Sequence, residues 1–263
     1  MKYWNLFTLC LQLKLTYKVR ITIWIINDTI NFAVFPFIWL AIFGNNSMIN
    51  GFSRADIVSY YIIMALISLA FSAHISNSIR PDIIEGGLNS ILVRPINYIM
   101  YQIIVEWSYR LVTIILAIPL IIMLYIFVPQ YLLLPFSVVY LLFFVISLLL
   151  SLALSFLIQF VIGLAVFWFG ETGAMDGVRH ILNNVFSGKL APLVFYPLFL
   201  QKTADILPFK YMYYFPFQIY SGRVNYLEIG QGFGITIFWI LFFSLVVYML
   251  WRRGLKNYDG AGM

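Results

Sequence analysis

Residues capable of nucleophilic, acid–base or metal chemistry are few in this sequence and lie far apart. Cys10 is the only cysteine, which excludes an internal disulfide and a cysteine-based metal cage. His74 and His180 have no cysteine nearby, and no Ser, His and Asp set stands at a spacing typical of a catalytic site. Gly188-Lys189 does not complete a phosphate-binding loop, because no glycine stands five residues earlier and a leucine follows the lysine. We therefore expect no catalytic, cofactor-binding or metal site in this chain.

Segment 80–98 contains residues that could bind another protein. Leu88, Ile91 and Leu92 fall at helical spacing, with two glycines just before them and Pro95 just after. This pattern predicts a short amphipathic helix at a membrane surface, whose apolar face would dock into a soluble partner. The alternative is an ordinary solvated turn between two spans.

The elements that must position this segment are membrane helices, as the composition indicates. The chain is 63% hydrophobic and 10% charged, whereas a soluble domain carries roughly 25% charged residues. Its apolar runs are long enough to cross a bilayer. The net charge of +6 is no argument for nucleic acid, because in a membrane protein the distribution of Lys and Arg sets orientation. We expect an all-α polytopic membrane protein with one transmembrane domain, 1–263.

Six spans follow from the basic residues at both ends of the chain. The N-terminal residues 1–20 lack a cleavage site and should stay as an interfacial helix on the cytoplasmic side, and the C-terminal residues are also basic. An even number of crossings is then required. Taking the long apolar run 132–170 as one tilted helix, and not as two crossings, gives spans at 21–43, 57–79, 99–128, 132–170, 177–200 and 232–251. Residues 171–180 would form a second cytoplasmic loop, and 202–228 an outer re-entrant or interfacial segment.

Charged residues inside the predicted spans need partners. Asp28 should face protein or lie near the cytoplasmic interface, because a carboxylate at mid-bilayer costs about 2.5 to 3.5 kcal/mol on insertion scales. Glu106 and Arg110 stand four residues apart in the order that favours an intrahelical ion pair.

The fifth predicted span contains three structural breaks, at Gly188, Pro192 and Pro197. Non-helical backbone at membrane depth survives only where protein or water satisfies it. We therefore expect this segment to be irregular and enclosed.

Four motifs resemble the permease subunits of type-2 ATP-binding-cassette (ABC) exporters, the ABC-2 family of transporters. They are Gly87–Pro95, Phe186–Leu193, Leu207–Tyr211 with Pro216 beyond it, and Arg252–Gly262. They occur in the order typical of this family around six spans. Asn89 departs from the pattern, since many relatives carry an acidic residue there.

The resemblance implies a subunit that forms half of a translocation pathway and contacts membrane lipid. A second permease subunit, identical or different, would complete the pathway, and separate cytoplasmic ABC ATPase subunits would bind the ATP that no cofactor site in this chain holds. The ATPase-coupling residues would be Glu85, Gly87, Leu88, Asn89, Ile91, Leu92 and Arg94. The location implied is the bacterial cytoplasmic (inner) membrane, with multiple passes and both termini cytoplasmic. A secondary transporter and a membrane-embedded enzyme are the alternatives, and the substrate stays open.

Overall fold

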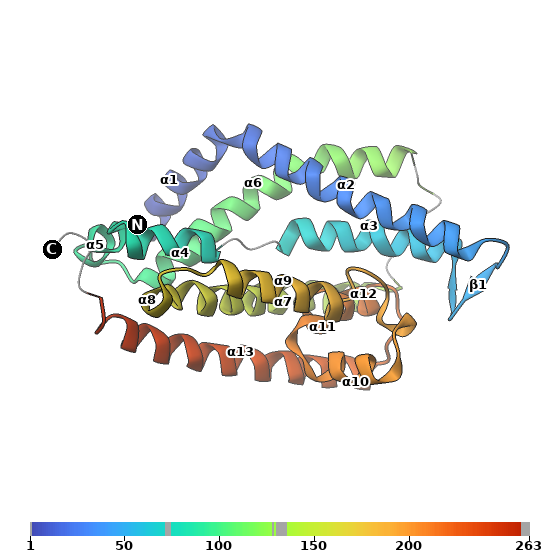
Figure 1. Cartoon of the computed structure of the whole chain (residues 1–263). Helices are drawn as coiled ribbons and strands as arrows, with labels where there is room; N and C mark the ends of the chain where they lie inside the picture. The colour runs from blue at the N-terminus through green and yellow to red at the C-terminus, as the bar shows by residue number, and fades with distance from the viewer. Residues whose placement is uncertain (1, 72–74, 128, 130–135, 259–263) are drawn as a thin grey trace.

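Long helices lie side by side along the molecule in the computed structural model, which describes residues 2–71, 75–127, 129 and 136–258 (Figure 1). The long helices are α2 (Lys18–Phe43), α3 (Arg54–Phe71), α6 (Tyr98–Phe127), α7 (Val138–Leu164) and α13 (Tyr226–Gly254). Within the described residues, four helical stretches are long and apolar enough to cross a membrane: Lys18–Phe43, Tyr98–Met123, Val138–Phe169 and Tyr226–Gly254. These helices agree with the prediction of a helical, multi-pass membrane protein, while their number, four, does not confirm the six predicted spans.

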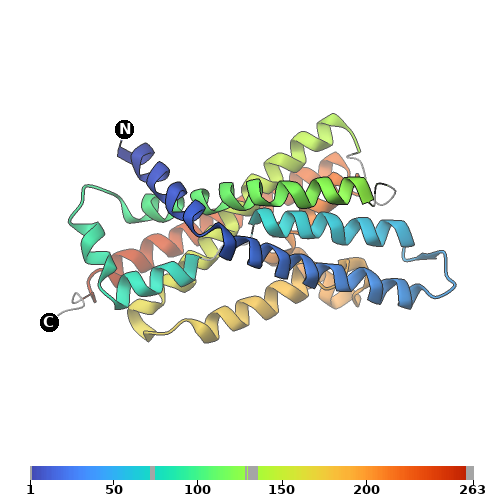
Figure 2. The same cartoon turned by 90° about the horizontal axis from the view of Figure 1, so that it is seen from above.

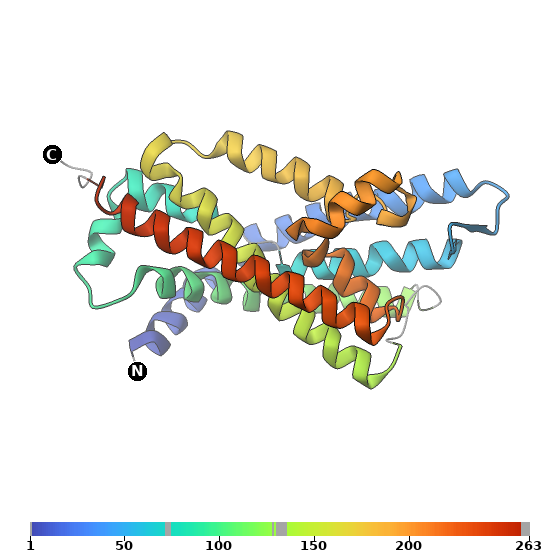
Figure 3. The same ribbon diagram turned by 90° about the horizontal axis from the view of Figure 1, so that it is seen from below.

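Two packing layers organise these helices. Helices α2, α3 and α6 lie next to one another (Figure 2), and α13 packs along α7 on the other side (Figure 3). Only 7% of the apolar window of α2 is buried inside the chain. An exposed apolar surface of this extent marks contact with a membrane or with another protein.

One end of the molecule, called here the α5 end, gathers short helices at the ends of the long ones (Figure 1). It contains the start of α1 (Lys2–Thr16), α4 (Ile75–Ile84), α5 (Gly87–Leu92), α8 (Val166–Phe169) and the end of α13. An apolar cluster holds α4, α5, α8 and the end of α13 together, with further residues contributed by α6 and α7, while α1 packs on α6.

The opposite end, called here the hairpin end, contains a two-stranded hairpin and three short helices (Figure 1). Strand β1 (Met48–Ile49) pairs antiparallel with β2 (Phe52–Ser53). Helices α10 (Leu198–Ile206), α11 (Pro208–Met212) and α12 (Tyr214–Tyr220) lie at this end, with α11 and α12 packed on α7. Helix α9 (Gly173–Phe186) and a short 3₁₀ turn, Leu193–Phe195, lead to them from the α5 end.

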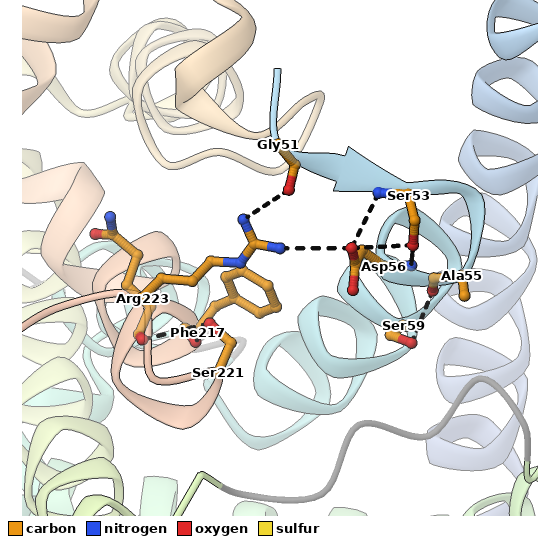
Figure 4. A network of polar contacts seen from close by, with 9 residues as sticks. Gly51, Ser53, Ala55, Asp56, Ser59, Phe217, Ser221 and Arg223 are labelled. Atoms are coloured by element: carbon orange, nitrogen blue, oxygen red, sulfur yellow. Dashed lines mark hydrogen bonds and ion pairs between the residues drawn. The ribbon is translucent and has the colours of Figure 1, made fainter. Parts of the chain in front are cut away.

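A partly buried arginine, Arg223, connects the loop before α13 to the β1–β2 hairpin and to the start of α3 (Figure 4). The guanidinium of Arg223 lies 3.7 Å from the carboxylate of Asp56 and donates a 3.4 Å hydrogen bond to the carbonyl of Gly51. It also stacks over the ring of Phe52, 3.9 Å from the ring centroid. The loop before α13 is therefore fixed to the hairpin and to the first turn of α3.

Several predicted boundaries need correction. The helix expected over 57–79 is α3 and α4, and α4 continues to Ile84, so residues 80–84 are helical and do not belong to a surface turn. Pro81 does not end α4, because its carbonyl still accepts a 2.9 Å hydrogen bond from the Glu85 amide. Residues 72–74, including His74, lie outside the described residues, as do 128 and 130–135 at the predicted third and fourth spans.

Val138–Phe169 is one helical stretch, since α8 follows α7 after a single residue. The predicted loop 171–180 is wrong, because α9 begins at Gly173. The predicted fifth span, 177–200, is not one helix: α9 ends at Phe186 and an irregular segment follows it.

Candidate functional site

Helix α5 folds back sharply on α4, and two glycines make this turn possible. Gly86 has a φ of +81°, which favours glycine. A Cβ atom on Gly87 would lie 3.2 Å from the Cα of Asp82, tighter than almost all real contacts. The glycines seen in the sequence therefore position α5 directly against the end of α4.

The apolar side of α5 faces the protein. Leu88 is fully buried and Ile91 nearly so, and both join the cluster that includes Ile79 of α4 and Leu164 of α7. The docking face predicted from the sequence is therefore wrong for Leu88 and Ile91: they attach α5 to the ends of the long helices and are not available to a partner. The spacing of apolar residues defines a face of a helix but does not say what covers it.

The outer side of α5 is polar at its centre and apolar at its end. Asn89 is exposed, as are Glu85 and Arg94 on the flanking turns, while Gly87 is half-buried. Leu92 is 45% exposed and the neighbouring Val93, which the sequence did not single out, is 84% exposed. This mixed surface is what α5 offers to a soluble partner.

A polar network beneath α5 was not predicted. The carboxylate of Asp82 accepts 2.8 Å hydrogen bonds from the hydroxyl of Tyr98 and from the amide of Gln102. Ser78 donates a 3.0 Å hydrogen bond to the Gln102 oxygen. The network connects α4 to the start of α6. Its one sign in the sequence is that Tyr98 and Gln102 stand four residues apart, on the same face of a helix.

The break after α9 is enclosed by protein, as its sequence predicts. Gly188 has a φ of +85°, and its carbonyl accepts a hydrogen bond from the Tyr60 hydroxyl. The Tyr61 hydroxyl donates to the carbonyl of Leu190 at 2.6 Å. Gly188 and Pro192 are buried, whereas Pro197 is exposed at the start of α10. Two adjacent tyrosines of α3, which sequence reasoning missed, thus satisfy backbone groups that helical bonds leave open.

The predicted ion pair inside α6 is confirmed. Arg110 lies 2.8 Å from Glu106, and both side chains are largely buried. A buried pair one helical turn apart avoids the cost of an isolated charge in an apolar surrounding.

These features define a multi-pass helical membrane protein with a short helix seated on the ends of its long helices. Comparison with protein families identifies it further: residues 29–262 match the family described as ABC-2 family transporter protein, and the chain belongs to that family. It is thus a membrane permease component of the ABC transporter type, as the motif resemblance predicted. A search among curated proteins found no match.

Proposed function

We propose that this chain is the permease subunit of an ATP-driven exporter, coupled through α5 to a separate cytoplasmic ABC ATPase. It would form half of a translocation pathway, which a second permease subunit completes. The observation that carries the proposal is the two-sided placement of α5. Its buried side is packed on the long helices, and its outer side presents Asn89, Leu92 and Val93.

This placement supports mechanical coupling. Force applied to α5 reaches α4, α6, α7 and α13, because Leu88 and Ile91 share one packed cluster with residues of all four helices. Closure of an ATPase pair on ATP would push α5 and rock these helices as a rigid body. A packed cluster transmits such displacement because it resists compression.

We further propose six crossings, with both termini cytoplasmic in a bacterial inner membrane. The crossings would be α2, then α3 with α4, α6, α7 with α8, α9 with the break after it, and α13. The positions of the connections support this order, since the hairpin follows α2, α5 follows α4, α8 ends α7 and the α10–α12 group follows the break (Figure 1). Helix α1, with Trp4, Leu9 and Leu13 exposed, would lie in the lipid headgroup region.

Reconstitution with the ATPase subunit tests the coupling role. The chain alone should hydrolyse no ATP, and the complex should do so. The double variant Leu92→Asp, Val93→Asp should no longer co-purify with the ATPase, because charge would enter a contact that must be dehydrated. Its amount in the membrane should match that of the unchanged chain and its unfolding temperature should fall by no more than about 4 °C, since both side chains are exposed.

Met48→Asp is the matched control. Met48 is an exposed apolar residue of the hairpin, at the opposite end from α5. This variant should retain ATPase binding and hydrolysis. ATPase binding by the Leu92, Val93 double variant at the normal level would refute the coupling role of α5.

A further inference from the structure

A large cavity with charged walls lies between α2, α3, α4, α6 and α9, and it encloses about 1120 Å³. Ligand sites for small organic molecules usually measure about 300 to 1,000 Å³, so this space accommodates a molecule of that size or larger. Charged side chains inside a membrane protein are costly and are generally retained for a function. The cavity wall contains both carboxylates and cations.

The charges of the cavity are predominantly basic. Lys14, Arg20 and Lys189 line it, against the carboxylates of Asp28 and Glu106. Glu106 forms the ion pair with Arg110 and is thereby compensated within α6. Asp28 is the remaining carboxylate on the wall, so an incoming anion meets more attraction than repulsion.

Lys189 follows Gly188 directly and lies in the break after α9. Its ammonium lies 4.1 Å from the ring centroid of Tyr213 and 3.4 Å from the hydroxyl of Ser68, and both partners are neutral. No carboxylate of a described residue lies within 4.0 Å of it. The irregular backbone at Gly188 thus places a cation on the wall of the cavity. Asp28 on the same wall is near enough to attract this charge, but it forms no ion pair with Lys189.

Polarity changes along the cavity in a fixed direction. On the lining face of α2, the charged residues Arg20 and Asp28 lie toward the junction with α1, among the apolar residues Ile21, Trp24 and Ile25. The described lining residues of α2 toward the hairpin end, Val34, Phe35 and Ile38, are all apolar. From Arg20 to Ile38 the helix rises about 27 Å at 1.5 Å per residue. One end of the space therefore suits a charged group and the other end an apolar body.

We propose that this cavity binds an amphipathic anion, with its phosphate or carboxylate group at Arg20 and Lys189 and its apolar part along Phe35 and Ile38. Building on the exporter function proposed above, this names the substrate class as anionic amphiphiles. An apolar cation of the same size is disfavoured, because the basic groups repel it. Asp28 would then limit how far the anionic group can enter.

Binding to the full-length chain tests the site directly. The chain is placed in nanodiscs of phosphatidylcholine, and fluorescent dodecyl phosphate and its trimethylammonium analogue are titrated, with empty nanodiscs as the background. The phosphate should bind saturably and the ammonium analogue at least about tenfold more weakly, the change in binding constant that corresponds to 1.4 kcal/mol. Equal binding of the two probes overturns the proposal.

Substitutions of the cavity-lining cations test where the phosphate probe binds. Lys189→Gln should weaken phosphate binding about tenfold, Lys189→Arg should retain it, and Lys202→Gln, on exposed helix α10 outside the cavity, should leave it unchanged. Arg20→Gln is the second variant, because Arg20 belongs to α2 and its substitution leaves the sequence of the break unchanged. Unchanged binding in both Gln variants overturns the site.

Transport in proteoliposomes that contain the permease and its ATPase distinguishes a transported substrate from a lipid that only occupies the cavity. ATP-dependent movement of the dodecyl phosphate supports the substrate class. Hydrolysis coupled to the permease without movement of the bound probe overturns the substrate class and leaves the exporter function intact. Failure of the chain to activate its ATPase refutes the exporter function, while the nanodisc titration still decides the anion site.

Discussion

Toward the hairpin end, Tyr60, Tyr61 and Trp239 donate hydrogen bonds to main-chain carbonyls, whereas the network around Asp82 at the α5 end joins side chains to one another. Tyr60 and Tyr61 reach the carbonyls of the break, and the indole of Trp239 donates to the Ile206 carbonyl at 2.9 Å. At the α5 end, by contrast, the Asp82 carboxylate accepts bonds from Tyr98 and Gln102.

The difference reflects what each end must stabilise. The hairpin end contains irregular backbone among apolar helices, and each unpaired carbonyl there would carry a desolvation cost. The α5 end has regular helices but must hold a six-residue helix in a defined orientation. We infer that the hairpin end acts as a fixed scaffold and the α5 end as the part that transmits force.

A buried charge on α5 should give the largest effect. Leu88→Asp places a carboxylate in the apolar cluster of the α5 end, at a cost of about 3 to 5 kcal/mol for an unpaired buried charge. Little folded permease should remain, measured as monodisperse protein after detergent extraction.

Leu92→Asp is the matched variant on the outer side of the same helix. It should cost about 1 kcal/mol or less, since Leu92 is partly exposed. Equal losses of folded permease in Leu88→Asp and Leu92→Asp would mean that α5 does not pack with Leu88 inward and Leu92 outward.

A methyl group at the break should give the next largest effect. Gly188→Ala should destabilise the chain by about 2 to 3 kcal/mol, because the left-handed conformation costs a non-glycine residue free energy. The new Cβ would also lie 2.8 Å from the Tyr60 hydroxyl. Thermal unfolding in one detergent measures the change.

Gly230→Ala in α13 provides the comparison, because no neighbouring atom lies within 4 Å of its added Cβ. Alanine is favoured over glycine inside a helix by about 0.5 to 1 kcal/mol, so this variant should unfold at a slightly higher temperature. Two variants with the same unfolding temperature would contradict the description of the hairpin end as a fixed scaffold.

Arginines at the two ends should give the smallest effects, and the hairpin end should show the larger one. Arg223→Gln removes the contacts with Asp56 and the ring of Phe52, worth about 1 to 2 kcal/mol for a partly buried cation. Arg80→Gln removes an exposed 2.7 Å ion pair with Glu171, worth about 0 to 1 kcal/mol.

The same unfolding assay decides between these two arginines, and Glu171→Gln checks the exposed pair from its other partner. A larger loss for Arg80 than for Arg223 would reverse the proposed order of the two ends.

Local patterns in the sequence predicted local features well. The spacing of Glu106 and Arg110 predicted their ion pair, and the glycines and proline around α5 predicted a short helix. The position of Gly188 and Pro192 predicted an enclosed irregular segment. Each of these depends on residues within a few positions of one another.

Features that depend on contacts between residues far apart in the sequence could not be predicted from local patterns. The burial of Leu88 depends on side chains from α4, α7 and α13, and the sequence alone does not reveal that they meet. The carbonyl partners of Tyr60 and Tyr61 lie 128 and 129 residues away. For the same reason, the role of Lys189 as a cavity-lining cation became visible only in the folded chain.

The long separation between Tyr60 and Gly188 also concerns the synthesis of the protein. Because the chain is made from its N-terminus, α3 is complete before the ribosome has added residue 188. The hydroxyls of Tyr60 and Tyr61 are then already available when the carbonyls of the break arrive. The early helix α3 thus carries the hydrogen-bond donors that the later, irregular segment needs.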